Sequence, residues 1–149
     1  MTTRAAPAIR RAVLADLPAI VALLDELSPQ TPLPLERARA LFAEISATPN
    51  MHLWVADDGG DVVGTYTMWI MPNLGHGGAP LAIVESVVVA AARRGQGIGE
   101  ALMRHAMAEA RRAGCYKLAL SSNGRRLDAH RFYRRLGFQP HGISFAIAP

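Results

Sequence analysis

The segment Arg94-Gly95-Gln96-Gly97-Ile98-Gly99 combines an arginine with three glycines and stands just before a long stretch of helical periodicity. Its amides are therefore expected at a helix N-terminus, where unpaired N–H groups and the helix dipole attract anions. The glycines let the backbone approach a ligand without Cβ clashes, and Arg93 and Arg94 add charges that can pair with phosphate oxygens. We predict that this segment holds the phosphates of a ligand.

Two familiar nucleotide-binding patterns do not fit this segment. A dinucleotide fingerprint would need a glycine where Glu100 stands, and a Walker loop would need Gly-Lys followed by Ser or Thr, which is absent. Both patterns fail on spacing.

Glu85 is the one charged residue in the apolar run Leu81 to Val89. It lies two residues before Val87, so the alternation of a strand would place both side chains on one face. A carboxylate there can take the proton of an ammonium group, directly or through water. Two other roles stay open, since Glu85 can also pair with a basic side chain or line a substrate pocket without transferring a proton.

The periodicity of the chain predicts the elements that position these residues. Helices are expected over 17–27, with Asp16 as cap, and around 38–45, 99–113 and 129–136, the last with Asp128 as cap. Strands are expected at 9–13, 52–56, 62–71, 81–89, 117–121, at Phe138 and over 143–148. The order β-α-α-β-β-β-α-β-α-β-β predicts an α/β fold, with a mixed, largely antiparallel twisted sheet and helices on both faces.

Length and composition suit one compact domain over residues 1–149, because half of the 149 residues are hydrophobic. The single cysteine, Cys115, excludes an internal disulfide and a cysteine-rich zinc site. The histidines show no metal-ligand spacing, so we expect no metal. No run of about 18 apolar residues occurs, and we expect a cytoplasmic protein that does not enter a membrane.

Positive charge gathers in one part of the chain. Eleven Lys and Arg stand against three Asp and Glu between Arg93 and Arg135, which leaves that stretch at +8 within a net charge of +4. The asymmetry predicts a polyanionic partner, such as the phosphates of a cofactor, a phosphorylated substrate or nucleic acid. We do not expect nucleic acid, because the sequence lacks an interleaved aromatic or helix-turn-helix pattern.

Two motifs together resemble the GNAT superfamily of N-acetyltransferases. The valine run followed by Arg-x-x-Gly-x-Gly and an amphipathic helix is similar to the family's acetyl-CoA-binding motif. The segment Ala-His-Arg-Phe-Tyr-Arg-Arg-Leu-Gly-Phe over 129–138 resembles its later helix-strand signature. The resemblance runs from about Ile9 to the C-terminus and is sharpest over Ile83 to Phe138.

The resemblance implies a site with acetyl-CoA as cosubstrate. The main chain of Val87, Val88 and Val89 would hold the pantetheine arm and the acetyl carbonyl, and Arg94 to Gly99 the pyrophosphate. Some family members, including glucosamine-phosphate acetyltransferases, carry a glutamate just before the valine run, which makes Glu85 the candidate general base. Tyr133 matches the family tyrosine near the sulfur and is the candidate general acid.

The implied activity is acetyl transfer to a primary amine, of a small molecule rather than a protein. The alternative is a GNAT-like module that binds coenzyme A without transferring an acetyl group. Asn123 lies farther from the aromatic helix than the family's asparagine, and Arg125 and Arg126 can touch phosphates, an acidic substrate or solvent. The resemblance is compatible with a homodimer, and the loops 28–34 and 72–80 are expected to select the acceptor.

Overall fold

A computed structural model describes residues 5–29 and 31–149. The chain forms two compact units, Met1–Ala119 and Leu120–Pro149, which are described one at a time.

The first unit is built on an open sheet whose strands follow the chain order. The strands are β1 (Ala8–Arg11), β2 (Met51–Asp58), β3 (Asp61–Met71), β4 (Leu81–Val89) and β5 (Lys117–Leu120), whose last residue begins the second unit. Each of the first three strands pairs antiparallel with the next. Tight connections favour this arrangement, and the β2–β3 turn at Gly59 and Gly60 shows why: both have positive φ, +67° and +100°, as a type I′ hairpin turn requires.

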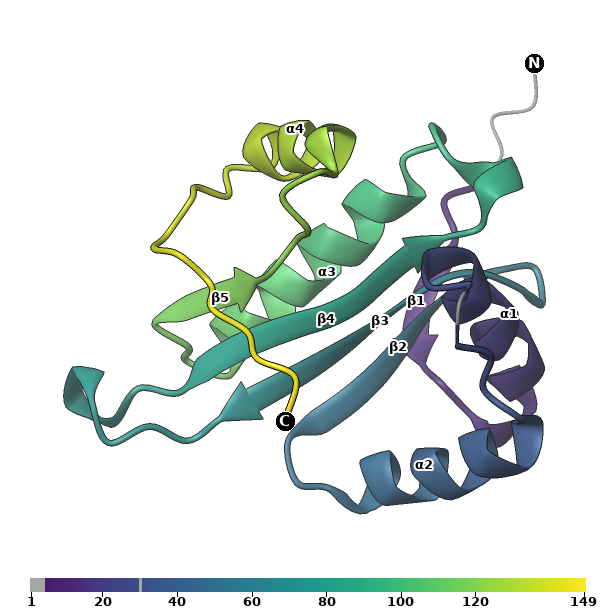
Figure 1. Cartoon of the computed structure of the whole chain (residues 1–149), viewed down its shortest axis with the longest axis horizontal. Helices are drawn as coiled ribbons and strands as arrows, with labels where there is room; N and C mark the ends of the chain where they lie inside the picture. The colour runs from purple at the N-terminus through teal and green to yellow at the C-terminus, as the bar shows by residue number, and fades with distance from the viewer. Residues whose placement is uncertain (1–4, 30) are drawn as a thin grey trace. The chain divides into compact units, whose positions relative to one another are not determined.

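Helices cover both faces of this sheet (Figure 1). The helices α1 (Leu17–Leu27) and α2 (Leu35–Ala47) pack on one face, and α3 (Ile98–Arg112) packs on the other. Short 3₁₀ turns at Leu14–Asp16, His76–Gly78 and Ala91–Arg93 join these elements. The predicted fold class, a mixed and largely antiparallel sheet between two layers of helices, is confirmed.

Gly64 shows how closely α3 approaches the sheet. A Cβ built on this residue would lie 3.0 Å from Cδ1 of Leu102 and 3.2 Å from the carbonyl oxygen of Val88. A side chain at this position of β3 would therefore push against Leu102 and the Val88 carbonyl, and glycine lets helix α3 pack here without that displacement. The largest fully buried side chains include Tyr66 and Met68, which lie on the same face as Gly64 by strand alternation.

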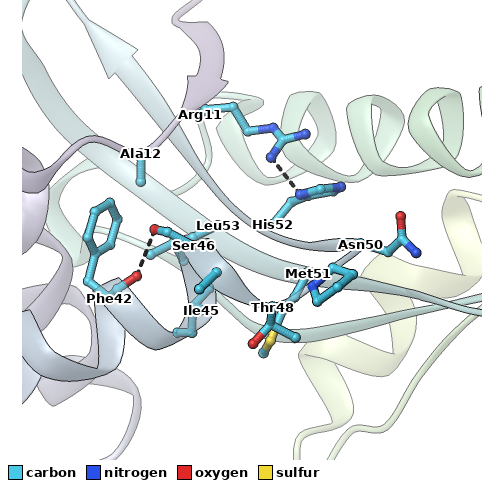
Figure 2. Close-up of a pocket in the computed structure, with 12 residues that line it drawn as sticks. Arg11, Ala12, Phe42, Ile45, Ser46, Thr48, Asn50, Met51, His52 and Leu53 are labelled. Atoms are coloured by element: carbon cyan, nitrogen blue, oxygen red, sulfur yellow. Dashed lines mark hydrogen bonds between the residues drawn. The ribbon is translucent and has the colours of Figure 1, made fainter.

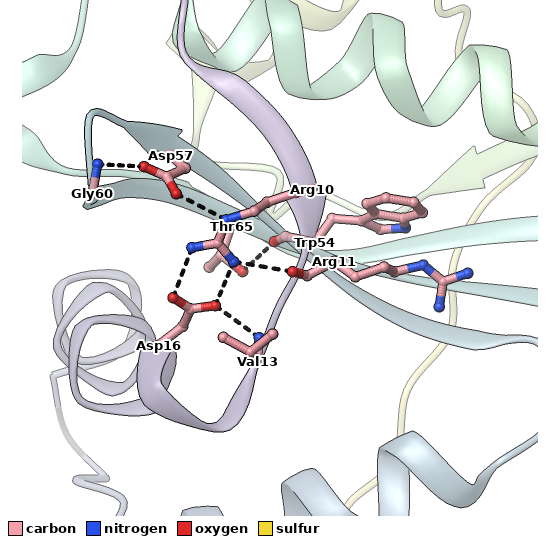
Figure 3. Close-up of polar contacts among 8 residues, drawn as sticks. All are labelled: Arg10, Arg11, Val13, Asp16, Trp54, Asp57, Gly60 and Thr65. Carbon is pink, nitrogen blue, oxygen red and sulfur yellow. Dashed lines mark hydrogen bonds and ion pairs between the residues drawn. The ribbon is translucent and has the colours of Figure 1, made fainter.

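An ion-pair network fixes the start of α1 on the opposite face (Figure 3). The Arg10 guanidinium donates to both carboxylate oxygens of Asp16, at 2.8 and 3.0 Å, and to Asp57 at 2.8 Å. Asp16 also accepts the Val13 N–H at 2.8 Å. The predicted cap of α1 thus bonds the turn before the helix and the first strand, and none of these bonds goes to an N–H of α1.

The second unit contains α4 (Leu127–Arg135), which ends in a Schellman motif. Phe138 N–H donates to the Tyr133 carbonyl and Gly137 N–H to the Arg134 carbonyl, both at 3.0 Å, with Gly137 at φ +95°. The Tyr133 and Phe138 rings pack edge to face, with centroids 5.7 Å apart, as the hydrophobic contact of this motif. The Gly-Phe pair of the predicted signature is therefore the helix stop.

Two predicted features of this unit are wrong. Asp128 is not the cap of α4, because a turn in which the Asn123 side chain accepts the Arg125 N–H starts the helix earlier, at Leu127. The predicted strands at Phe138 and over 143–148 are absent, since no strand is assigned after Leu120 in the described part of the unit. Alternating apolar residues form a strand only where a neighbouring edge supplies hydrogen bonds.

Candidate active site

The predicted phosphate-binding segment has the free donors that an anion requires. Gly97 is the N-cap of α3, with φ +79°, and Gly95 is also left-handed, with φ +73°. The first loop-to-helix bond is donated by Ala101 N–H to the Gly97 carbonyl. Within the described residues, the N–H groups from Gly95 to Glu100 have no acceptor. The segment therefore fits the pyrophosphate of a coenzyme.

The two arginines before this loop have different roles. Arg93 donates to the Asp58 carboxylate at 2.5 Å and to the Gln96 side chain at 3.0 Å, and its side chain is only 18% exposed. Arg94 keeps 59% of its side chain exposed and donates through Nε to the Val89 carbonyl at 3.2 Å. Arg94 is thus the more accessible of the two to an anion, whereas Arg93 joins the loop to the β2–β3 hairpin.

Glu26, near the end of α1, holds the connection between β4 and α3. Its Oε2 accepts the Ala91 N–H at 2.9 Å and lies 3.8 Å from an Arg94 nitrogen. No sequence pattern indicated this contact, because the two segments are joined only by the tertiary structure.

A β-bulge in β4 overturns the expected placement of Glu85. Thr65 pairs with Val88 and Thr67 with Glu85, so β4 has one residue more than β3 between these pairs. Ser86 takes up the extra length at φ +54°. Directly paired residues share a face, so Glu85 lies on the same face as Val88, and the alternation that would join it to Val87 is broken.

The Glu85 carboxylate is exposed on the face that carries α1 and α2. In the part of the chain that the structure describes, it has no hydrogen bond and no basic side chain within 4.0 Å. An ion pair with a basic side chain, one of the roles left open by the sequence, therefore finds no partner here. The carboxylate is free to meet a cationic group from solution.

The last residues of β4 extend beyond β5. The Tyr116 N–H, one residue before β5, donates to the carbonyl of Pro80, one residue before β4, so the two strands start level. β5 has 4 residues and β4 has 9. The outer edge of Val87, Val88 and Val89 is therefore past the end of β5, and its backbone groups can pair with an extended ligand.

Tyr133 belongs to the second unit, and its surroundings there suit a proton donor. Its ring is half-buried between Phe132, at a centroid distance of 5.2 Å, and Phe138. Burial raises the pKa of the Tyr133 hydroxyl, and the nearby Arg126 charge opposes part of that rise. The hydroxyl is therefore protonated at neutral pH, and within the described residues it makes no hydrogen bond.

Asn123 and its neighbours have structural partners. Besides the side-chain bond to Arg125 N–H, the Asn123 carbonyl lies 2.9 Å from Nε2 of His130. Asn123 therefore organises the entry into α4. Within the described residues, neither Arg125 nor Arg126 forms an ion pair with an acidic side chain, so both remain available to an anion.

A pocket of about 320 Å³ lies between the C-terminal half of α2 and the start of β2 (Figure 2). Phe42 and Ile45 of α2 and Met51 and Leu53 of β2 contribute its apolar wall. It does not include Glu85 or the glycine loop, so it is separate from the predicted cofactor groups.

Residues 5–29 and 31–149 contain neither a metal-binding cluster nor a membrane-spanning helix. No group of three or more His, Cys, Asp or Glu side chains is arranged to hold a metal ion. No helix in these ranges combines the length and apolar character needed to cross a membrane.

The fold and the glycine loop are those of an acetyltransferase, and comparison with known families agrees. The Acetyltransferase (GNAT) family model matches residues 19–138. The chain belongs to the GNAT acetyltransferase family, as its two motifs predicted, and it is an acyltransferase by class. The family uses acetyl-CoA as its acyl donor.

Individual relatives support this assignment along most of the chain. This chain is 35% identical to the aminoalkylphosphonate N-acetyltransferase of Salmonella typhimurium, over 94% of this chain and 90% of the relative. It is 33% identical to glucosamine 6-phosphate N-acetyltransferase 1 of Oryza sativa, over 93% and 85%. A solved acetyltransferase of Trypanosoma brucei matches with a TM-score of 0.83 and 28% identity, over 95% and 99%.

Proposed function

We propose that this protein transfers the acetyl group of acetyl-CoA to a primary amine of a small molecule by direct attack. The observation that carries the proposal is the arrangement along one strand and its exit. β4 presents the exposed, unpaired carboxylate of Glu85, then the open edge of Val87 to Val89, and then a loop with free N–H groups from Gly95 to Glu100. The general base, the binding edge for the acyl arm of acetyl-CoA and the binding loop for its pyrophosphate would thus follow one another along the chain.

Glu85 is the proposed general base. An amine in its ammonium form cannot attack until it loses a proton, which the carboxylate would accept directly or through water. The amine nitrogen then bonds to the acetyl carbon, the carbon–sulfur bond breaks, and the nitrogen loses its second proton to solvent as the amide forms. Main-chain groups of Val87 to Val89 would hold the acyl arm, and Arg94 with the loop amides would neutralise the pyrophosphate.

Tyr133 is the proposed general acid. The departing sulfur leaves as a thiolate, and a hydroxyl that is protonated at neutral pH can hydrogen-bond or protonate it. The raised pKa of Tyr133 supports this role. The proposal requires the two units to act together as one domain, in line with a family match that spans both.

The acceptors named for the relatives guide the choice of amine. Aminoalkylphosphonates and glucosamine 6-phosphate each combine an amine with a phosphorus oxyanion. We include this class in the proposal because Arg125 and Arg126 have no acidic partner within the described residues. The test is thiol release from acetyl-CoA with a panel holding both acceptors, their amines without phosphorus, amino acids and polyamines.

A coenzyme A-binding module without transfer activity is the competing function. Calorimetry with coenzyme A and the amine panel separate the two. Binding with no thiol release from any amine would favour the module, and absence of coenzyme A binding would overturn both. Light scattering tests the homodimer, which stays a prediction.

A further inference from the structure

Trp69 exposes a large aromatic ring beside the candidate base. The side chain lies on β3 and is 42% exposed. Trp69 pairs with Ile83 and Thr67 pairs with Glu85, so Trp69 and Glu85 are diagonal neighbours on one face of the sheet. The Cβ atoms of such neighbours are about 7–8 Å apart, within reach of aromatic and long side chains.

The other tryptophan, Trp54, differs from Trp69 in both its burial and its contacts. Trp54 is only 8% exposed, packs against the His105 ring at 4.4 Å and has the Arg11 guanidinium over its ring at 4.6 Å. No ring contact, cation or hydrogen bond is recorded for Trp69 among the described residues. The Trp69 ring is therefore not engaged by another ring or a cation of the described residues, and the 42% of it that is exposed can contact a ligand.

The apolar pocket beside α2 continues the same row of side chains. Met51 pairs with Trp69 and Leu53 with Thr67, and both Met51 and Leu53 line the pocket. Neighbouring strands are about 4.8 Å apart, so the pocket wall on β2 is two strand spacings, roughly 10 Å, from Glu85 on β4. A small molecule can span that distance.

The side chains of the two basic residues that line the pocket, Arg11 and His52, point away from it. His52 pairs with Met68 and Arg11 with Trp54, which places both side chains on the α3 face, and they bond each other at 2.5 Å. In Figure 2 these two side chains lie on the opposite side of β2 from Phe42 and Ile45. The strand positions around Trp69 on this face therefore offer apolar surface and the exposed carboxylate of Glu85.

We propose that Trp69 and Glu85 form a recognition site for the ammonium form of the acceptor, a primary alkylammonium whose carbon chain runs over Met51 and Leu53 toward the pocket. The ring attracts the cation by a cation–π interaction, and the carboxylate accepts a charge-assisted hydrogen bond from it. The site rests on the proposed function in one respect, that Glu85 faces the acceptor. Trp69 acts here as a specificity-determining residue that does no chemistry.

The first test measures binding without turnover. The Trp54→Phe variant leaves Trp69 as the single tryptophan, so its fluorescence reports this site. The variant is titrated, with and without coenzyme A, with propylammonium chloride, with propan-1-ol as the neutral comparison and with sodium chloride as the salt control. We expect a saturable change with propylammonium only. Equal responses to propylammonium and propanol, or no response to either, would overturn the proposal.

The second test compares variants by calorimetry with propylammonium. Trp69→Leu should weaken binding about two- to thirtyfold, the range that cation–π energies give, and Trp69→Phe should weaken it less. Leu14→Ala, which trims another exposed apolar side chain, should have no effect. Unchanged affinity in a folded Trp69→Leu variant would refute the site.

The outcome of these propylammonium-binding tests can be distinguished from the outcome of the acetylation assay. Specific propylammonium binding in a protein that releases no thiol from acetyl-CoA would support the site and count against the proposed function. Acetylation of amines with a Michaelis constant unaffected by Trp69→Leu would support the function and reject the site.

Discussion

The carboxylate of Glu26 lies 3.8 Å from the guanidinium of Arg94, the arginine exposed beside the predicted phosphate-binding loop. The same carboxylate accepts the Ala91 N–H at 2.9 Å. Glu26 thus supports the loop through one bond, and under the proposed function its charge would compete with the cofactor phosphate for Arg94.

Replacing Glu26 with glutamine should tighten coenzyme A binding about two- to threefold. Glutamine can still accept the Ala91 N–H but no longer attracts Arg94, and an exposed ion pair is worth at most about 1 kcal/mol. Calorimetry measures the effect, with Asp25→Asn as a control that removes the same charge one residue away. An equal gain in both variants would show that only overall charge matters.

Replacing Gly97 with valine should lower coenzyme A affinity by about tenfold or more, because the side chain would occupy the approach to the free amides. The added Cβ meets no protein atom within 4 Å, so the fold is disturbed only by backbone strain at φ +79°, roughly 1–2 kcal/mol. Gly114→Val is the matched control, since Gly114 is also left-handed and open but follows the other end of α3. If both variants bind coenzyme A alike, the loop is not the phosphate site.

Glu85→Gln should reduce kcat by about a hundredfold while keeping the fold and acetyl-CoA affinity, because the amide cannot accept the ammonium proton. The rate of the variant should recover as rising pH deprotonates the amine itself. Initial rates against pH measure both effects. A higher KM with unchanged kcat and pH profile would make Glu85 a binding residue only.

Tyr133→Phe should lower kcat about tenfold or more and leave acetyl-CoA affinity nearly unchanged. Only the hydroxyl is lost, while the ring keeps its packing against Phe132 and Phe138. The measurement must be made where chemistry limits turnover, as a pre-steady-state burst assay establishes. Wild-type rates under that condition would reduce Tyr133 to a structural residue.

Asp16→Asn should destabilise the fold by about 1–3 kcal/mol at pH 7, since Asp16 is 7% exposed and accepts bonds from Arg10 and the Val13 N–H. The Arg10 bond lowers the pKa of Asp16 below its ordinary 3.8, so its stabilising contribution is present above pH 3.8 and is lost as pH falls through the lower folded-state value. Urea unfolding between pH 7 and pH 3 should show the two proteins converging in acid. A constant difference would contradict the network.

Local patterns predicted most of the elements of the first unit. β4 spans Leu81–Val89 as its apolar run predicts, and α1 spans Leu17–Leu27 as its periodicity predicts. The glycine loop at the start of α3 was also predictable, because positive φ and free N–H groups at a helix start are properties of a few consecutive residues.

The tertiary structure decided what depends on partners distant in the chain. Pairing with β3 placed a bulge at Ser86 and moved Glu85 away from the face of Val87, and Asp58 engaged Arg93, whereas Arg94 stayed exposed. The C-terminal run 143–148 has the alternation of a strand and forms none. By itself the sequence determined the family and the candidate residues of the site, because the motifs that carry both are local. The face on which a side chain lies, its ion-pair partner and the free edge of a strand depend on the tertiary structure. Each of them is set by packing between segments that are distant in the sequence.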